Sequence, residues 1–489
     1  MGDRSFVYWY STLERHLCGY CKNEQGNVSH GMWAKTLTVE DYQNLIDRGW
    51  RRSGNYCYKP LMNEICCPMY TIKCNVLNFQ LSKSQKKVVK KFNKFLKDGV
   101  LNKNENHPVA TENSDNIAEF FHKEAPAHLS QELHDSNLLL ESDKTVVSDT
   151  DNQSTSQSEH NAVLSKSEVR NAPAAKSSVE TPKTGVGADP NKPPCKKAKV
   201  LRMERKKEKL LKRGMSLEKI NVKNNEQKTV EEFLNDVSQD NQHKLKITLE
   251  QIHENHKHFR LTADLFAKYQ ISVHNETPDD CDDIQYVNFL IDSPLQHVRF
   301  TKESEVGFGS FHQLYWLDDK LIAVGVIDIL PKCVSAVYFF YDPDYRDLTL
   351  GTYGSLREVE FARSLHQMVP SIENYYMGFY IHSCPKMRYK GKLTPSFLLC
   401  PETYHWIPIE KCVPKLEVSK YSRLEDDDTA VDENLCSGRD LDETKILYNR
   451  KLVLLKQYKR KYNVQSLFET IGQLIGQKCS KSIIFIGDN

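Results

Sequence analysis

The sequence predicts an α/β protein, and three segments in the second half of the chain carry that prediction. Segments 321–330 and 334–341 are almost continuously apolar, as strands buried on both faces of a sheet are. Segment 355–369 repeats its apolar residues at helical spacing, and 375–381 is again an aromatic strand. Strand, strand, helix and strand in this order are typical of an N-acetyltransferase-like (GNAT-like) fold. We therefore expect a catalytic domain of that type.

Composition divides the rest of the chain. The 489 residues are 39% hydrophobic with a mean hydropathy of −0.60, which is low for one compact globule and leaves room for two or three domains. We expect five parts in this order: a small cysteine-rich, metal-binding N-terminal domain at 1–100, a disordered linker at 101–195, a basic and partly helical segment at 196–244, the GNAT-like domain at 245–415, and a C-terminal extension at 416–489 whose helices pack on the catalytic domain. The linker is too polar to offset its chain entropy by burial.

The composition also indicates where the protein resides. The first 17 residues lack the apolar core of a signal peptide, and no apolar run approaches the roughly 20 residues that span a bilayer. The 14 cysteines do not follow the dense pattern of a small secreted domain. We expect a soluble, monomeric protein of the cytoplasm and nucleus with reduced thiols and no membrane partner. The net charge of +2 means that any nucleic-acid surface must come from local clustering.

Two cysteine pairs in the N-terminal region predict a metal site. Cys18 and Cys21 form a C-x-x-C pair, and Cys66 and Cys67 are adjacent. Four thiolates suit tetrahedral structural zinc, and they suit an iron–sulfur cluster equally well. Adjacent cysteines are a less usual chelating pair, so other ligands are conceivable: Cys57, Cys74 or His16. The simpler alternative is that Cys66 and Cys67 are ordinary core thiols.

Lysines recur at steps of three and four in the segment after these cysteines. On a helix they form one stripe: Lys83, Lys87, Lys90, Lys94 and Lys97. Apolar residues occupy the opposite face: Val88, Val89, Phe92, Phe95 and Leu96. Such a stripe can follow a phosphate backbone, and the alternative is a solvated face of an amphipathic helix. A second basic segment, Lys196–Arg213, fits RNA binding, nuclear import or a solvated helix equally well.

Three further motifs resemble one family. They are FGSFHQLYWLDDKLIAVGVIDILP at 308–331, YYMGFYIHSCPKMRYKG at 375–391 and LLCPETYHWIPIE at 398–410. Together they resemble the C-terminal half of eukaryotic arginyl-tRNA–protein transferases, and CGYC and ICCP match the N-terminal pattern of the same family. One departure is Ile291-Asp292, where family members often carry a cysteine, so a cysteine there is not essential in this chain.

The resemblance implies an activity and its partners. Arginyl-tRNA would be the co-substrate, and the lysine stripe is the candidate surface that the residue spacing offers for it. The arginine would be transferred to the α-amino group of proteins that begin with Asp, Glu or oxidised Cys, which creates a degradation signal read by ubiquitin ligases. The cysteines would bind the metal and be needed for activity. Acetyl-coenzyme A is not expected, because segment 341–361 is longer and more acidic than a coenzyme A cradle.

Arginyl transfer sets chemical demands that select candidate residues. A guanidinium is best bound by carboxylates, and Asp328 and Glu358 are the candidates to hold it or to steer the attacking amine. The alternative is that Asp328 caps its strand and Glu358 is a charge at the start of a helix. His382 is a candidate base, although the ribose hydroxyl at the tRNA 3′ end can carry the proton instead. We expect five residues to contact the substrates: Tyr380, Ser383, Lys386, Lys390 and Gln313.

Two other functions compete with this one. An acetyltransferase on the same fold would use acetyl-coenzyme A and ignore tRNA. A non-catalytic, zinc-dependent RNA-binding protein would bind charged and uncharged tRNA alike. The sequence contains no G-x-S-x-G, H-E-x-x-H or P-loop motif, which argues against hydrolases, metalloproteases and NTPases.

Overall fold

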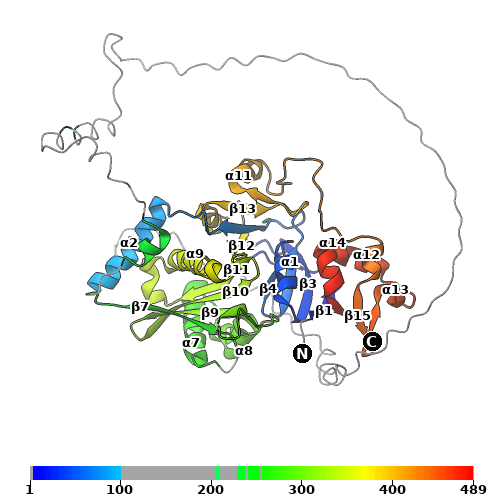
Figure 1. Cartoon of the computed structure of the whole chain (residues 1–489), viewed down its shortest axis with the longest axis horizontal. Coiled ribbons are helices and arrows are strands. Elements are labelled where there is room, and N and C mark those ends of the chain that lie inside the picture. Colours follow the sequence, from blue (N-terminus) through cyan, green and yellow to red (C-terminus); the bar gives the residue numbers. More distant parts are fainter. Residues whose placement is uncertain are drawn as a thin grey trace, which may run out of the picture. The chain divides into compact units, whose positions relative to one another are not determined.

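The computed structural model describes residues 4–100, 205, 208, 228–236, 240–253, 256–304 and 306–487. They form a mixed α/β structure with two sheets (Figure 1). The predicted linker at 101–195 and the basic segment Lys196–Arg213 lie outside the described residues, apart from Arg205 and Glu208. No helix within the described ranges has both the length and the apolar character needed to cross a membrane.

The first sheet is built from both ends of the chain. Its order is β16-β15-β17-β1-β3-β5-β4, and β2 pairs with β3 beside this path. β17 runs parallel to both β1 and β15, so the last strand joins the N-terminal and C-terminal strands. The strands are β1 (Phe6–Tyr10), β2 (Arg15–His16), β3 (Asn27–Thr36), β4 (Arg51–Ser53), β5 (Tyr56–Pro60), β15 (Lys445–Tyr448), β16 (Lys451–Leu454) and β17 (Ile484–Ile486).

The second sheet contains the predicted strand–strand–helix–strand order as β10, β11, α9 and β12. Its order is β14-β13-β6-β12-β11-β10-β9-β7, with β8 paired to β9. β9, β10 and β11 are antiparallel, and β11 and β12 are parallel because α9 connects them. The strands are β6 (Tyr70–Asn75), β7 (Leu245–Gln251), β8 (Val298–Arg299), β9 (Gly307–Leu317), β10 (Lys320–Leu330), β11 (Cys333–Tyr341), β12 (Asn374–Tyr380), β13 (Ser396–Leu399) and β14 (Trp406–Pro408).

Helices cover these sheets and connect their strands. The longer ones are α1 (Val39–Ile46), α2 (Lys83–Asp98), α7 (Phe259–Tyr269), α9 (Leu350–Met368), α11 (Ile409–Val418) and α14 (Gln465–Ser482). The short ones are α6 (Val230–Leu234), η3 (Gln270–His274), η4 (Pro278–Cys281), α8 (Asp283–Tyr286), η5 (Val287–Ile291), η6 (Pro343–Leu348), α10 (Pro385–Arg388), η7 (Tyr389–Lys392), α12 (Arg439–Asp442) and α13 (Leu455–Tyr458).

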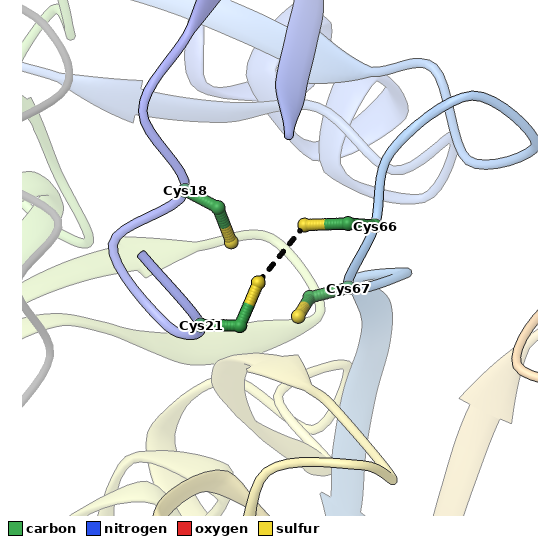
Figure 2. Close-up of side chains that lie close together, drawn as sticks. All are labelled: Cys18, Cys21, Cys66 and Cys67. Carbon is green, nitrogen blue, oxygen red and sulfur yellow. Dashed lines mark hydrogen bonds between the residues drawn. The ribbon is translucent and has the colours of Figure 1, made fainter. Parts of the chain in front are cut away.

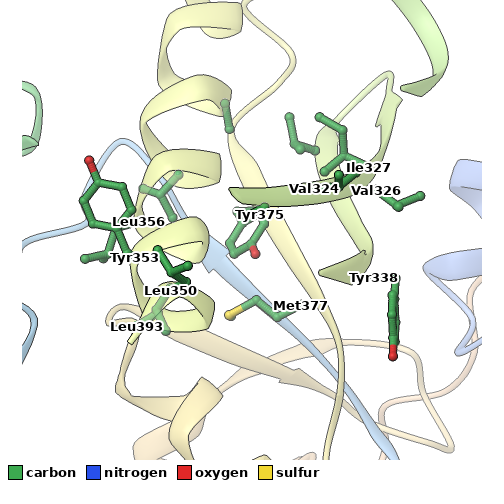
Figure 3. Close-up of a cluster of buried hydrophobic side chains, with 14 of the residues drawn as sticks. Val324, Val326, Ile327, Tyr338, Leu350, Tyr353, Leu356, Tyr375, Met377 and Leu393 are labelled. Carbon is green, nitrogen blue, oxygen red and sulfur yellow. The ribbon is translucent and has the colours of Figure 1, made fainter. Parts of the chain in front are cut away.

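Helix α9 packs closely on β11 and β12 of the second sheet. Gly354 makes this possible, because a Cβ atom there would lie 2.3 Å from the Phe339 ring. Figure 3 shows side chains of α9 and β12 meeting in the core between helix and sheet: Leu350, Tyr353 and Leu356 from the helix, and Tyr375 and Met377 from the strand. This packing brings the α9 residue Glu358 against the sheet.

Helix α2 has the two faces that its sequence predicts. A capping box between Ser82 and Gln85 starts the helix, and Gly99 in the left-handed region ends it. Phe92 stacks on Tyr353 of α9 with ring centroids 4.1 Å apart, so the apolar face is anchored to the second sheet's helix. All five lysines of the predicted stripe are exposed.

The strand pairings cross the expected domain boundaries. β6, from the region predicted to be a separate N-terminal domain, lies between β12 and β13 of the second sheet. The helices of the C-terminal extension were expected on the catalytic domain, but α14 packs on α1 and α12. The physical reason is that β15 and β17 extend the first sheet, which carries α14 to that side.

A buried ion pair joins the two sheets. Arg52 of β4 donates from Nη2 to Asp328 Oδ1 at 2.6 Å and from Nε to Oδ2 at 2.9 Å. Both side chains are almost fully buried, at 2% and 0% exposure. Arg52 also donates to the Ser310 hydroxyl, which donates in turn to Asp328. The carboxylate and the guanidinium thus neutralise each other in the interior.

We predict that Asp328→Asn destabilises the protein strongly. The substitution leaves a buried guanidinium without a countercharge, which costs about 3–5 kcal/mol. Urea unfolding followed by intrinsic fluorescence measures the loss. Asp426→Asn is the control, since Asp426 pairs with Lys415 on the surface and such pairs contribute at most about 1 kcal/mol. Equal unfolding midpoints for the two variants would contradict the structural role of Asp328.

Candidate functional site

The four predicted cysteines converge on one point. The sulfur atoms of Cys18, Cys21, Cys66 and Cys67 all lie within 4.8 Å of one another, and those of Cys21 and Cys66 are 3.2 Å apart (Figure 2). No other such group of His, Cys, Asp or Glu side chains occurs in the described part of the chain. The proposed substitutes Cys57, Cys74 and His16 do not belong to it.

Local backbone structure builds this cluster. The Cys18 amide donates to the Asn23 carbonyl and the Lys22 amide donates back to Cys18, which closes the turn of the C-x-x-C pair. Gly26 then allows the second pair to approach. A Cβ atom at Gly26 would lie 2.5 Å from the Cys66 sulfur, and the Gly26 carbonyl accepts from the Cys66 amide. Only glycine fits between the two cysteine pairs.

The four thiols shift one another's pKa values. The Cys67 thiol and nearby backbone amides lower the pKa of Cys18, while burial and the neighbouring thiols raise the pKa of Cys66 to about 12. The Cys18 thiol raises the pKa of Cys67. Several thiolates at this spacing repel one another, and a bound cation would remove that cost. The donor set therefore fits a thiolate-bound metal, either zinc or an iron–sulfur cluster.

The loop after β12 lies against this cluster. Phe379, Ile381 and Met387 share a hydrophobic cluster with Cys18 and Cys67. Two distant motifs of the sequence, the cysteines and the basic loop, therefore form one region. A metal bound at the cysteines would fix the residues on which that loop packs.

The predicted residues of the loop have different environments. The hydroxyl of Tyr380 and Nδ1 of His382 lie 2.9 Å apart, and burial lowers the pKa of His382. Ser383 is exposed and Lys386 is partly exposed. Lys390 is buried, and its amine lies 4.0 Å from the position that a Cβ would take at Gly378 in β12. Lys390 therefore points toward the strand, and Ser383 is the more accessible.

Asp328 and Glu358 do not meet. Glu358 Oε1 lies 2.9 Å from the position of a Cβ on Gly325, so it faces the side of β10 to which Gly325 points. Asp328 is three residues further along the same strand, and successive residues point to opposite faces. The two carboxylates lie on opposite faces of the second sheet. They cannot form one clamp around a guanidinium, and Asp328 already binds Arg52.

Glu358 is a buried acid with unfilled hydrogen-bonding capacity. Burial raises its pKa to about 8, although a hydrogen bond donated by the Tyr375 hydroxyl opposes this. Its other oxygen, Oε1, has no partner. Gln313 of β9 pairs with Gly325, its Cβ lies 3.7 Å from the same Cβ position on Gly325, and its side chain accepts a hydrogen bond from Tyr315 at 3.1 Å. The structure therefore brings Glu358 and Gln313 close together.

Gln313 also lines a cavity near this pair. The cavity has a volume of about 810 Å³ and lies between α9, α6 and β7. Two ion pairs form its polar walls: Arg357 with Glu360 at 2.7 Å, and Arg363 with Glu231 at 2.5 Å. Leu245, Ile247, Leu249 and Phe361 supply its apolar surface. Its size is that of a small-molecule or nucleoside site.

Helix α2 contacts the segment after β12 and the segment before α9. Gln85 of α2 donates to the Lys392 carbonyl at 3.2 Å, and Lys91 donates to the Asp347 carbonyl. None of the five stripe lysines forms an ion pair with another described residue. Their charge is therefore open to an anionic partner.

Sequence reasoning missed the residues that the first sheet contributes. Arg52 and Lys59 are buried against the second sheet or its loops, but no motif marked their partners. A weak signal was present. The run Arg51-Arg52 precedes the aromatic strand β5, and charged residues beside a strand need partners when buried.

Known proteins match this chain over nearly its whole length. A family model described as Arginine-tRNA-protein transferase, N terminus, matches residues 16–87, and one described as Arginine-tRNA-protein transferase, C terminus, matches 262–400. Arginyl-tRNA–protein transferase 1 of Drosophila melanogaster is 43% identical over 99% of both chains. Arginyl-tRNA–protein transferase 2 of Arabidopsis thaliana is 35% identical over 83% of this chain and 76% of its own length. Aspartate/glutamate leucyltransferase of Campylobacter jejuni is 30% identical over 21% of this chain and 41% of its own length.

We predict that the cysteine cluster holds a metal that stabilises the fold. Elemental analysis of protein purified without oxygen should find stoichiometric zinc or iron, and the double variant Cys21→Ser/Cys66→Ser should lose it. A chelator should then lower the melting temperature of the wild type but not of the double variant. Cys384→Ser is the control, because Cys384 lies in the adjacent loop outside the cluster. Full metal content in the double variant would exclude these ligands.

Proposed function

Because this chain belongs to the arginyl-tRNA–protein transferase family, we propose that it transfers arginine from arginyl-tRNA to proteins whose first residue is Asp, Glu or oxidised Cys. The 43% identity over the full length of a transferase carries this proposal. The acidic acceptors are supported by the partial match to a protein named aspartate/glutamate leucyltransferase. The product would be a degradation signal in the cytoplasm and nucleus.

The reaction exchanges one acyl bond for another. The acceptor's α-amine attacks the ester carbonyl of arginyl-tRNA, an amide bond forms, and the 3′-terminal ribose oxygen leaves with a proton. The amine has a pKa near 7.7–8.0, so it must first lose its own proton. No oxidant, metal-bound water or acetyl-coenzyme A is needed. The cysteine-bound metal is proposed to have a structural role at the base of the loop after β12.

The arrangement of the second sheet supports an N-acetyltransferase-like catalytic domain at 245–415. The antiparallel strands β9–β11, the crossing helix α9 and the parallel strand β12 follow the order expected for it. The cysteine-rich region at 1–100 would be its metal-binding partner. Since β6 belongs to the second sheet, the two regions are proposed to act as one unit.

For the donor, we propose the side of the sheet that carries α9. Gln313 would contact the arginyl end of the tRNA from the floor of the 810 Å³ cavity. Glu358, whose Oε1 has no partner, would hold the guanidinium or steer the amine from beneath. Asp328 is assigned a structural role instead, because Arg52 occupies both of its oxygens.

For the acceptor, we propose the loop after β12. Lys386 and Lys390 would attract an acidic first residue, and Tyr380 and Ser383 would supply hydroxyl donors. His382 would accept the amine's proton. Its lowered pKa favours the neutral imidazole that a base requires.

For the tRNA, we propose the lysine stripe of α2. Its five ammonium groups are exposed along one face, and the helix contacts the segments around Asp347 and Lys392. Phosphate contacts along this face would guide the tRNA's 3′ end toward α9. In the alternative, the stripe is a solvated face of an amphipathic helix and does not contact tRNA.

We predict that labelled arginine from arginyl-tRNA enters a peptide that begins with Asp but not one that begins with Gly. Acid precipitation and counting measure the incorporation. Adding acetyl-coenzyme A should change nothing, which separates this function from an acetyltransferase. If intact, metal-loaded protein binds charged and uncharged tRNA equally and transfers nothing, the RNA-binding alternative replaces the proposal.

We predict that Lys87→Gln/Lys94→Gln weakens tRNA binding and makes it less dependent on salt. Each lost phosphate contact lowers the slope of log K against log salt by about 0.7–0.9, so the double variant should lose roughly 1.5. Filter binding at several salt concentrations measures this slope. Lys451→Gln/Lys456→Gln, on and after the β15–β16 hairpin, is the matched control. An unchanged slope would mean that the stripe is a solvated face that does not contact the tRNA phosphates.

A further inference from the structure

A small cavity lies between the first sheet and β6. Its volume is about 30 Å³, enough for one water or for a group of similar size. Lys59 of β5, Thr71 of β6 and Tyr404 line it, together with Arg48. Met62 and Met69 belong to its lining and are partly exposed, so they mark the side nearer to solvent.

Thr71 presents an unused hydroxyl to this cavity. The residue is only 2% exposed, and its Oγ1 has no hydrogen-bond partner. Oγ1 is also the atom nearest to the space over Gly49, another lining residue, at 4.0 Å from the position of a Cβ there. A buried hydroxyl without a partner is costly, so its retention calls for an explanation.

Lys59 presents a buried amine that lacks a carboxylate. It donates to the Tyr404 hydroxyl at 2.7 Å and to the Leu474 carbonyl at 3.2 Å, both uncharged. An ammonium has three donors, so one is left over. The nearest acid, Asp432, is engaged by Arg48 through both oxygens at 2.9 and 2.7 Å. Burial lowers the pKa of Lys59 well below its usual value, and Arg48 adds to this effect.

Tyr404, which also lines the cavity, has an unusual backbone conformation. It is a non-glycine residue in the left-handed region, with φ at 58°. Arg48 lies 4.0 Å above its ring centroid and the Lys59 amine lies 4.5 Å away. Such a backbone conformation persists only where the surroundings enforce it, and it is concentrated at ligand sites.

The cavity is one strand away from the loop after β12. Tyr70 and Thr71 of β6 pair with Tyr380 and Phe379 of β12. The segment between β5 and β6 carries both Met69 and the cysteines Cys66 and Cys67. Thr71 therefore shares a face of the sheet with Phe379, which packs with Ile381 and Met387 of that loop, so a ligand held by the loop on this face has the unfilled donors of the cavity one strand away.

We propose that this cavity binds the side-chain carboxylate of the acceptor's first residue, with Lys59 and Thr71 as its donors. A carboxylate supplies the negative charge that Lys59 lacks and the acceptor that Thr71 lacks. An uncharged amide of the same shape leaves the buried amine without a countercharge. Lys59 and Thr71 are thus specificity-determining residues. This inference rests on the proposed function, because it takes acidic first residues as the substrates.

Two substitutions at one position test the hydroxyl. Thr71→Val keeps the shape and removes the hydroxyl, whereas Thr71→Ser keeps the hydroxyl. Binding of two heptapeptides that differ only in beginning with Asp or Asn, each with a fluorophore at the C-terminus, is measured by fluorescence anisotropy on the full chain. Thr71→Val should raise the Kd of the Asp peptide about tenfold and leave the Asn peptide unchanged. Thr71→Ser should stay near the wild type.

The stability of these variants separates binding from folding. The Thr71 hydroxyl makes no hydrogen bond in the protein, so Thr71→Val should not lower the melting temperature. Lys59→Met tests the amine and should abolish the preference for Asp over Asn. If the wild type does not distinguish the two peptides, or if Thr71→Val and Lys59→Met both bind them as the wild type does, the inference is overturned.

Arginine transfer to the same peptides is measured in parallel. Transfer to the Asp peptide with unchanged affinities in both variants overturns the cavity's role and leaves the proposed function standing. Absence of transfer by the wild type overturns the proposed function, and the binding comparison still decides whether the cavity takes a carboxylate.

Discussion

The buried pair of Arg52 and Asp328 is the constraint on which the rest of the arrangement depends. A carboxylate in the middle of an apolar strand is tolerable only with a countercharge, and that countercharge comes from the other sheet. The pair therefore sets β4 against β10 at a defined position. Ser310 completes the network, so that both oxygens of Asp328 are satisfied. Replacing either ion alone would bury an uncompensated charge, which makes the pair a strong determinant of how the sheets pack.

This packing decides which residues can share a site. The first sheet and the turn after α1 contribute buried cations where they meet the second sheet and its loops, among them Arg48, Arg52 and Lys59. The opposite face of the second sheet carries α9 with the buried acid Glu358 and the large cavity beside it. The buried acid Glu358 and these buried cations therefore lie on opposite sides of the second sheet, as Glu358 and Asp328 do.

The cysteine cluster has a similar organising effect on a smaller scale. It ties the turn at Cys18 to the segment between β5 and β6, and its apolar neighbours belong to the loop after β12. The same segment lines the cavity with Lys59 through Met62 and Met69. Loss of a metal from these thiols would therefore disturb both the loop after β12 and the cavity lined by Lys59, although neither of them ligates the metal.

The sequence by itself determined the local features whose cause is local. Helix α2 with its lysine stripe follows from a spacing of three and four, and β10, β11, α9 and β12 follow from apolar periodicity. The cysteine cluster was predictable because thiols in pairs have few other uses inside a reduced protein. Only the tertiary structure decided the partners of Asp328 and Glu358. Asp328 and Glu358 were both candidates to hold the guanidinium or steer the amine, but strand alternation put them on opposite faces, and Arg52, 276 residues from Asp328, neutralises one of them. Long-range pairing of charges leaves no periodic trace in a single chain, since it depends on which sheets meet, and for that reason the cavity of Lys59 and Thr71 could be found only in the folded protein.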